Sequence, residues 1–109
     1  IIDRGGFVFF AKSEGKIVGT FALIKLSETI YELAKMAVDE GFQGKKIGNK
    51  MLEFCIEEGR RLKADKIILF SNKRLEPAIH LYKKFGFEEV ALGSSEYKRA
   101  NIKMEVNIK

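Results

Sequence analysis

The sequence predicts an α/β (α+β) fold in which helices pack on the faces of a mixed, mostly antiparallel central sheet. Residues 7–38 contain apolar, β-branched segments separated by short polar turns, which is typical of an antiparallel meander. The apolar spacing then changes to that of a helix from Ile47 onward. Residues 102–108 alternate strictly between apolar and polar, which indicates a strand with one solvent-exposed face.

The meander contains three expected strands. Residues 7–11 and 17–26 are apolar runs, and the polar turn 13–16 between them contains a glycine that can adopt a positive φ. Residues 30–38 follow a second short turn at 27–29. We therefore expect each strand to pair with the one before it.

Two helices are expected in the second half of the chain. The first begins at Ile47 and extends for about 16 residues, with its apolar side toward the sheet. A short apolar strand follows at 67–70, so the strand–helix–strand order predicts a right-handed crossover and parallel pairing. Pro77 suits the first turn of the second helix, and Gly86 suits its C-terminal end. A further strand is expected at 87–92.

Composition narrows the class of protein. The 109 residues are 46% hydrophobic and 32% charged and include one proline, which excludes disordered, collagen-like and mucin-like chains. We expect a single domain over residues 1–109, and the lack of an initial Met predicts that it is the central and C-terminal part of a longer chain. The longest unbroken apolar run, residues 7–11, is far shorter than the ~20 residues of a membrane-spanning helix, so no membrane partner is expected.

The net charge and the single cysteine limit which partners, metals and cellular locations are expected. The net charge of +5 favours an anionic partner, which would be nucleic acid, an acidic membrane surface or a phosphorylated small molecule. The single cysteine, Cys55, forms neither an internal disulfide nor a zinc site by itself, so we expect a reducing, cytoplasmic location and no metal. Its place on the apolar side of the first helix indicates a buried structural thiol. His80, the single histidine, is expected to be a surface or half-buried residue without a catalytic role.

The segment from Gln43 to Lys50 joins a strand to the start of a helix and contains two glycines and three lysines. Unpaired N–H groups at a helix start attract anions, and glycines allow a phosphate to approach the backbone. The segment therefore predicts phosphate binding, although it lacks the P-loop and GxGxxG patterns. A solvated lysine cluster on an ordinary turn is the alternative.

Two motifs resemble the GNAT superfamily of acetyl-CoA-dependent N-acetyltransferases. Gln43-x-x-Lys46-x-Gly48, after a strand ending at Val38, resembles motif A of the family, [RQ]-x-x-G-x-[GA]. Residues 78–87 resemble its A-x-x-L-Y-x-K-x-G-F segment. The order of strands and helices also matches over nearly the whole chain, and it implies a GNAT-like sheet with a splay between two neighbouring strands.

The chain departs from the family pattern in three places. Lys46 stands where motif A has its first glycine, so its side chain either crowds the cofactor pyrophosphate or forms a salt bridge with it. Leu75 stands where the family often has Asn, and Asn72 is the alternative. The strand and two helices that usually begin the family, and that form much of its acceptor groove, are not recognised in this chain.

The resemblance implies acetyl-CoA as the co-substrate, bound between the strand ending at Val38 and the strand at 67–70. In the family the pantetheine arm pairs with the strand backbone, a backbone N–H near Met36 or Ala37 would hold the thioester oxygen, and the loop N–H groups would hold the pyrophosphate. The residues implied to bind the cofactor are Met36, Ala37, Val38, Gln43, Gly44, Lys45, Lys46, Ile47, Gly48, Asn49 and Asn72.

Two catalytic residues follow from the resemblance. Glu32 lies at the spacing from motif A at which family members carry a glutamate base, and its alternative role is that of a solvent-facing strand residue. Tyr82 falls where the family has its general-acid tyrosine, and its alternative role is that of a core tyrosine beside Ala78 and Phe85. A phenol with a pKa of ~10 can protonate a thiolate and is uncharged at neutral pH.

The leading hypothesis is an N-acetyltransferase that moves an acetyl group from acetyl-CoA to a primary amine by direct transfer in a ternary complex. The acceptor would be a small molecule or a peptide. One alternative is a non-catalytic acyl-CoA- or phosphate-binding module of the same fold, which Lys46 keeps open. Another is a small basic RNA-binding domain, although the spread of lysines and arginines through the chain argues against nucleic acid. An open sheet edge favours pairing between copies, so a homodimer also stays open.

Overall fold

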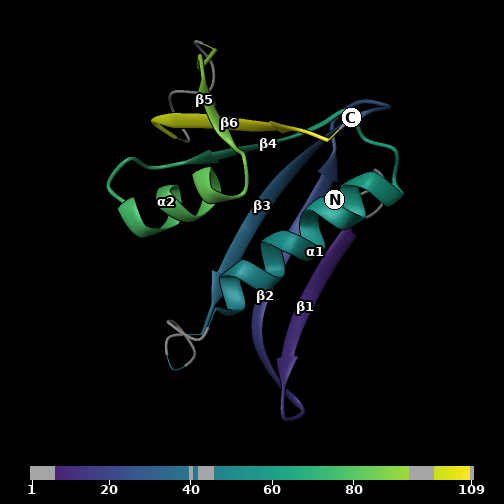
Figure 1. Ribbon diagram of the computed structural model, residues 1–109, viewed down its shortest axis with the longest axis vertical. Helices are drawn as coiled ribbons and strands as arrows, with labels where there is room; N and C mark the ends of the chain where they lie inside the picture. Colours follow the sequence, from purple (N-terminus) through teal and green to yellow (C-terminus); the bar gives the residue numbers. More distant parts are fainter. Residues whose placement is uncertain (1–6, 40, 42–45, 94–99, 109) are drawn as a thin grey trace.

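The computed structural model describes residues 7–39, 41, 46–93 and 100–108. Its strands and helices follow the order expected from the sequence (Figure 1). The elements are β1 (Phe7–Ser13), β2 (Lys16–Lys25), β3 (Ile30–Val38), α1 (Ile47–Arg61), β4 (Lys66–Ser71), α2 (Glu76–Lys84), β5 (Glu88–Val90) and β6 (Ile102–Asn107).

The strands form one six-stranded sheet in the order β1-β2-β3-β4-β6-β5. The first three strands pair as an antiparallel meander, and β3 pairs with β4 in parallel across the α1 crossover, as the sequence predicts. The last strand, β6, pairs antiparallel with both β4 and β5. The sheet is therefore mixed and mostly antiparallel. The strand expected at 87–92 is shorter than predicted, because β5 covers only Glu88–Val90.

Both described helices pack on the same face of the sheet (Figure 1). One core cluster unites the buried side of α1 with alternate residues of the central strands, and partly buried residues of α2 pack against that cluster. The core residues from these strands are Phe21, Leu23, Tyr31, Leu33, Ile67, Leu69, Ile102, Met104 and Val106. Cys55 belongs to the same core and is fully buried, which confirms a structural position for this thiol.

The strands β3 and β4 pair only over part of their length. Their parallel ladder ends at Leu33 and Leu69, whereas β3 continues to Val38. Figure 1 shows the two strands diverging beyond this point. The second half of β3 is still held on its other side by β2, through the pairs of Ala37 with Thr20 and Val38 with Gly19. The sheet is thus open between β3 and β4.

A bulge lies in β3 at the start of this opening. The register between β2 and β3 shifts between Thr20 and Ala22, and Lys35 has a φ of 56°, in the left-handed region. A bulge bends a strand and turns its following side chains and amides away from the regular ladder. The bulge therefore re-aims the backbone from Met36 onward, where the sequence places the cofactor.

Candidate functional site

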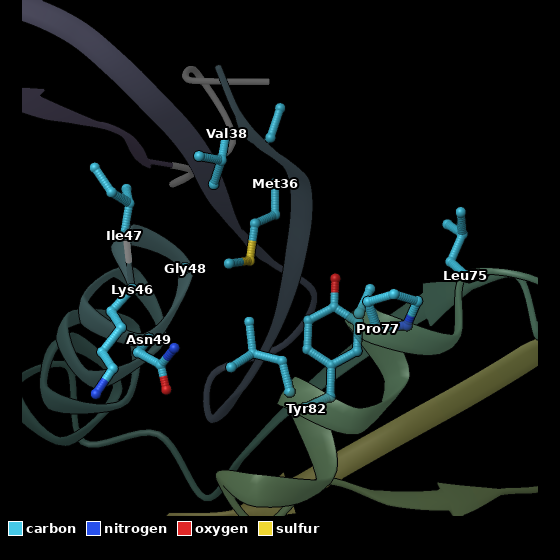
Figure 2. Close-up of a pocket in the computed structure, with 12 residues that line it drawn as sticks. Met36, Val38, Lys46, Ile47, Gly48, Asn49, Leu75, Pro77 and Tyr82 are labelled. Carbon is cyan, nitrogen blue, oxygen red and sulfur yellow. The ribbon is translucent and has the colours of Figure 1, made fainter. Parts of the chain in front are cut away.

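A cavity of about 720 Å³ lies at the opening of the sheet, on the side of the helices (Figure 2). We call it the first cavity. The end of β3 forms one wall, the first turn of α1 forms another, and α2 forms the third. The lining residues are Met36, Ala37, Val38, Lys46, Ile47, Gly48, Asn49, Leu75, Pro77, Ala78, Leu81 and Tyr82.

The first turn of α1 offers backbone N–H donors, and it contains no acidic side chain that would repel an anion. Its N-terminal cap is Lys46, no side chain caps the helix, and its first turn contains no acidic residue. The first N–H groups of a helix lack intrahelical acceptors and form the positive end of its dipole. This end of α1, at the rim of the first cavity, is therefore suited to an anion.

Lys46 adopts the backbone conformation that a glycine would adopt most easily. Its φ of 62° and ψ of 22° lie in the left-handed region, which costs an L-residue roughly 1–2 kcal/mol. Its side chain extends from the start of α1 at the wall of the first cavity (Figure 2). The backbone at this position therefore has the conformation typical of a glycine, and the Lys46 side chain places an exposed ammonium group there.

A second cavity, of about 460 Å³, meets the first at the same opening. Met36, Leu75 and Tyr82 line both cavities. The second cavity also contains Glu32, Asn72 and the β3 bulge residue Lys35. The two cavities therefore adjoin at these three residues.

Glu32 is a buried carboxylate on the face of the sheet opposite the helices. It alternates along β3 with Tyr31 and Leu33, which belong to the core on the helix side. Its neighbours across the two adjacent strands are both isoleucines, Ile24 and Ile68. The residue is only 5% exposed, so the alternative of a solvated strand residue does not describe it. Its access to solvent is through the second cavity.

Tyr82 projects from α2 into the first cavity, with its hydroxyl on the side toward Met36 (Figure 2). Its ring packs against Phe87, with ring centroids 5.9 Å apart. Burial raises the pKa of the Tyr82 phenol above its usual value of 10.0, and the nearby Cys55 thiol raises the pKa further. The phenol is therefore a neutral proton donor at any physiological pH. Tyr82 combines packing against the core with a polar end in the cavity.

The structure brings together most of the residues expected at the cofactor site. Seven of those implied by the resemblance line the first cavity, which are Met36, Ala37, Val38, Lys46, Ile47, Gly48 and Asn49. The expected positions Gln43, Gly44 and Lys45 lie outside the described residues.

Asn72 is not brought to the first cavity. It lines the second cavity, and its side-chain oxygen accepts a hydrogen bond of 2.9 Å from the backbone N–H of Arg74. His80 is exposed on α2, as expected, and lines neither of these cavities.

Four residues that line the first cavity were not expected at the cofactor site. Leu75, Pro77, Ala78 and Leu81 complete the cavity from α2 and the residue before it. The matched segment at 78–87 contains Ala78 and Leu81, so the signal for those residues was present in the motif. The sequence marked Leu75 as the position where the family often has Asn and Pro77 as a first-turn helix residue, but neither pattern indicated that the residue lines a cavity.

Across the part of the chain that the structure describes, no three His, Cys, Asp or Glu side chains are grouped so that they could hold a metal ion. No described helix is long and apolar enough to cross a membrane.

A comparison with known protein families identifies the family to which this chain belongs. The family model described as acetyltransferase (GNAT) domain matches residues 4–89. The chain belongs to the GNAT acetyltransferase family. The match contains both motifs and most of the two cavities described above.

Relatives and solved structures agree with this family. An uncharacterized N-acetyltransferase of Bacillus subtilis, YvbK, is 27% identical over 98 residues, which cover 90% of this chain and 63% of that protein. A GNAT acetyltransferase from Staphylococcus aureus superposes with a TM-score of 0.86 at 33% identity, over 99% of this chain and 71% of that one. A GNAT acetyltransferase from Elizabethkingia anophelis, solved with acetyl-CoA bound, gives a TM-score of 0.86 at 19% identity, over 97% of this chain and 78% of that one.

The matched part of the relatives is not their full length. An uncharacterized N-acetyltransferase of Dictyostelium discoideum is 37% identical over 60 residues, which are 55% of this chain and 28% of that protein. The chain thus spans less than two thirds of both curated relatives.

Proposed function

We propose that this chain carries the catalytic core of an N-acetyltransferase, which transfers an acetyl group from acetyl-CoA to a primary amine in a ternary complex. The observation that carries the proposal is the meeting of the two cavities at Tyr82 and Met36, in the opening between β3 and β4. Direct transfer needs two substrates to touch at a point with acid and base groups nearby. We assign that point to this opening, where Glu32 and Tyr82 line one cavity.

Two features of the first cavity support acetyl-CoA as its ligand. The end of β3 offers an extended backbone from Met36 to Val38 beyond the point where the ladder to β4 ends. An extended arm such as pantetheine can bind to such an edge as an added strand does. The start of α1, with Lys46 and no acidic side chain in the first turn, favours the pyrophosphate. The acetyl-CoA bound to the Elizabethkingia anophelis relative supports this choice of ligand.

The second cavity would admit the amine. An ammonium group is not a nucleophile, so the acceptor must lose a proton before it attacks. Glu32 is the carboxylate within the second cavity, and we assign it this proton, either directly or through a water molecule. Ile24 and Ile68 flank it on the two adjacent strands, so its position in the sheet is fixed by the strand pairing.

The remaining steps use β3 and α2. The amine nitrogen attacks the thioester carbon, and a backbone N–H near Met36 or Ala37 stabilises the oxyanion that forms. Removal of one such donor typically costs roughly 3 kcal/mol of barrier. The carbon–sulfur bond then breaks, and Tyr82 donates its proton to the departing CoA thiolate. As the amide forms, the attacking nitrogen releases its second proton, which replaces the one that Tyr82 gave to the thiolate. The products are the N-acetylated amine and free CoA, and Glu32 releases its proton to solvent.

Calorimetric titration of the protein with acetyl-CoA tests the cofactor, and release of CoA with a panel of primary amines tests the reaction. Saturable one-to-one binding at micromolar concentration is expected, together with amine-dependent CoA release. CoA release can be followed with a thiol reagent, because Cys55 is buried and does not compete. The absence of binding at millimolar acetyl-CoA would overturn the proposal.

A non-catalytic acyl-CoA-binding module of the same fold is the second candidate. The observation that favours it is the side chain of Lys46 at the position of the first glycine of motif A. The same experiment separates the two functions. Tight binding of acetyl-CoA without CoA release from any amine in the panel would favour the module.

A further inference from the structure

The helices α1 and α2 contact each other at the rim of the first cavity through two adjacent pairs. The Lys84 ammonium donates a hydrogen bond of 2.9 Å to the side-chain oxygen of Asn49. One residue earlier on α1, a β-carbon added to Gly48 would lie 3.0 Å from Cδ2 of Leu81, so the two helices approach closely there. The first turn of α1 is therefore joined to α2 by one polar and one apolar contact.

The two α2 residues that make these contacts lie on either side of Tyr82 along the helix. Leu81 precedes Tyr82, and Lys84 lies two positions after it. Residues three apart on a helix share a face, so Leu81 and Lys84 present one side of α2 to α1. Tyr82 projects from the neighbouring side into the cavity that both helices line.

Helix α2 is less buried than α1, although its residues Ile79, Leu81 and Tyr82 pack against the core. None of its residues is fully buried, whereas α1 has four buried residues in the core. A helix with little buried surface is free to shift by small amounts, and a displacement of about 1 Å in a catalytic group can cost about 10²-fold in rate. A polar contact that fixes the last turn of α2 is thus placed to control where the Tyr82 hydroxyl lies.

We propose that Lys84 is a positioning residue, which holds α2 against Asn49 of α1 and so fixes Tyr82 in the opening of the sheet. The inference rests on the proposed function, because it assigns Lys84 an effect on the step in which Tyr82 donates a proton. Lys84 acts through Tyr82 and touches no reacting atom. The same contact links the start of α1, where the cofactor phosphate would bind, to α2, which carries Tyr82.

The test compares Lys84→Met, Lys84→Arg and the control Lys83→Met in the full protein. Methionine keeps the length and apolar stem of lysine and removes the ammonium, whereas arginine keeps a donor. Lys83 lies beside Lys84 in the last turn of α2 and is also exposed, so its substitution removes one charge without the contact to Asn49. Because the pair is exposed, we expect all three variants to fold and to melt close to the parent temperature.

The expected result is a drop in kcat of roughly tenfold for Lys84→Met, with the dissociation constant of acetyl-CoA unchanged within about twofold. Lys84→Arg should recover most of the lost kcat, and Lys83→Met should match the parent. In a Tyr82→Phe background, Lys84→Met should cause no further loss, because the group that it positions is gone.

Three outcomes would overturn the proposal. Weaker binding of acetyl-CoA with kcat unchanged would make Lys84 a phosphate contact. An equal loss of kcat with and without Tyr82 would show that Lys84 does not act through the tyrosine. An unchanged Lys84→Met enzyme, when Tyr82→Phe is impaired, would remove the positioning role and leave the proposed function intact. Failure of the proposed function shows separately, as an absence of amine-dependent CoA release by the parent protein.

Discussion

Glu32 of β3 and Tyr82 of α2 line the same cavity, although they lie far apart in the sequence. The carboxylate is buried on the face opposite the helices, and the phenol extends from the helix face. The two faces of the sheet communicate because the ladder between β3 and β4 ends at Leu33 and Leu69. The base and the acid that we propose, Glu32 and Tyr82, would therefore act on one pair of reacting groups from opposite faces of the sheet.

Replacement of Tyr82 by Phe should lower kcat by about 10²-fold or more, in the range typical of a general acid. The ring would still pack against Phe87, so acetyl-CoA binding and thermal stability should change little. Because burial raises the pKa of the phenol above 10.0, Tyr82 should be at least about nine-tenths protonated at pH 9, and it should cause no marked alkaline fall in the parent kcat below that pH. Equal losses of cofactor affinity and kcat would instead indicate a packing role.

Replacement of Glu32 by Gln should lower kcat/KM for the amine by roughly 10²-fold at pH 7. The deficit should shrink as the pH rises toward ~10, because a growing fraction of a typical alkylamine acceptor is then already deprotonated. Rates across pH 6–10 for the parent and the variant check this. A deficit that stays constant over this range would mean that Glu32 does not accept the amine proton. The control variant is Ser71→Ala, which changes another residue that lines the same cavity.

Replacement of Lys46 by Gly should have opposite effects on stability and binding. Glycine adopts the φ of 62° at this position without the strain of a side chain, so the free energy of unfolding should rise by roughly 1 kcal/mol. Affinity for acetyl-CoA should fall if the ammonium contacts the pyrophosphate, and the fall should diminish in high salt. Urea unfolding and calorimetric titration at two salt concentrations measure both effects. Tighter binding by Lys46→Gly would show that the side chain crowds the phosphate.

Cys55 should be unreactive in the folded protein. Burial raises its pKa from 9.0 to about 12, so very little thiolate exists at pH 8. Labelling by a thiol reagent should therefore follow global unfolding, and its rate should rise steeply with urea. Since the folded pKa is raised, the contribution of this group to stability is complete below pH 9.0 and is lost as the pH rises toward about 12. Rapid labelling in the absence of urea would contradict this burial.

The sequence predicted the meander, the crossover helix and the parallel pairing of β3 with β4, because the apolar periods of these segments are regular and change abruptly. The short β5 was harder to bound, because three residues offer too little alternation to mark its ends. The motif at residues 78–87 also placed Tyr82 on a helix, where the structure has it in the first cavity.

The sequence by itself determined the order of the elements, the family and the residue types to which we assign the chemistry. Only the tertiary structure decided that both described helices lie on one face, that Glu32 is buried between two isoleucines, and that Lys84 reaches Asn49. These relationships depend on strand register, on the bulge at Lys35 and on the angle between helices. No local pattern specifies such long-range geometry, because it is set by how the whole core packs.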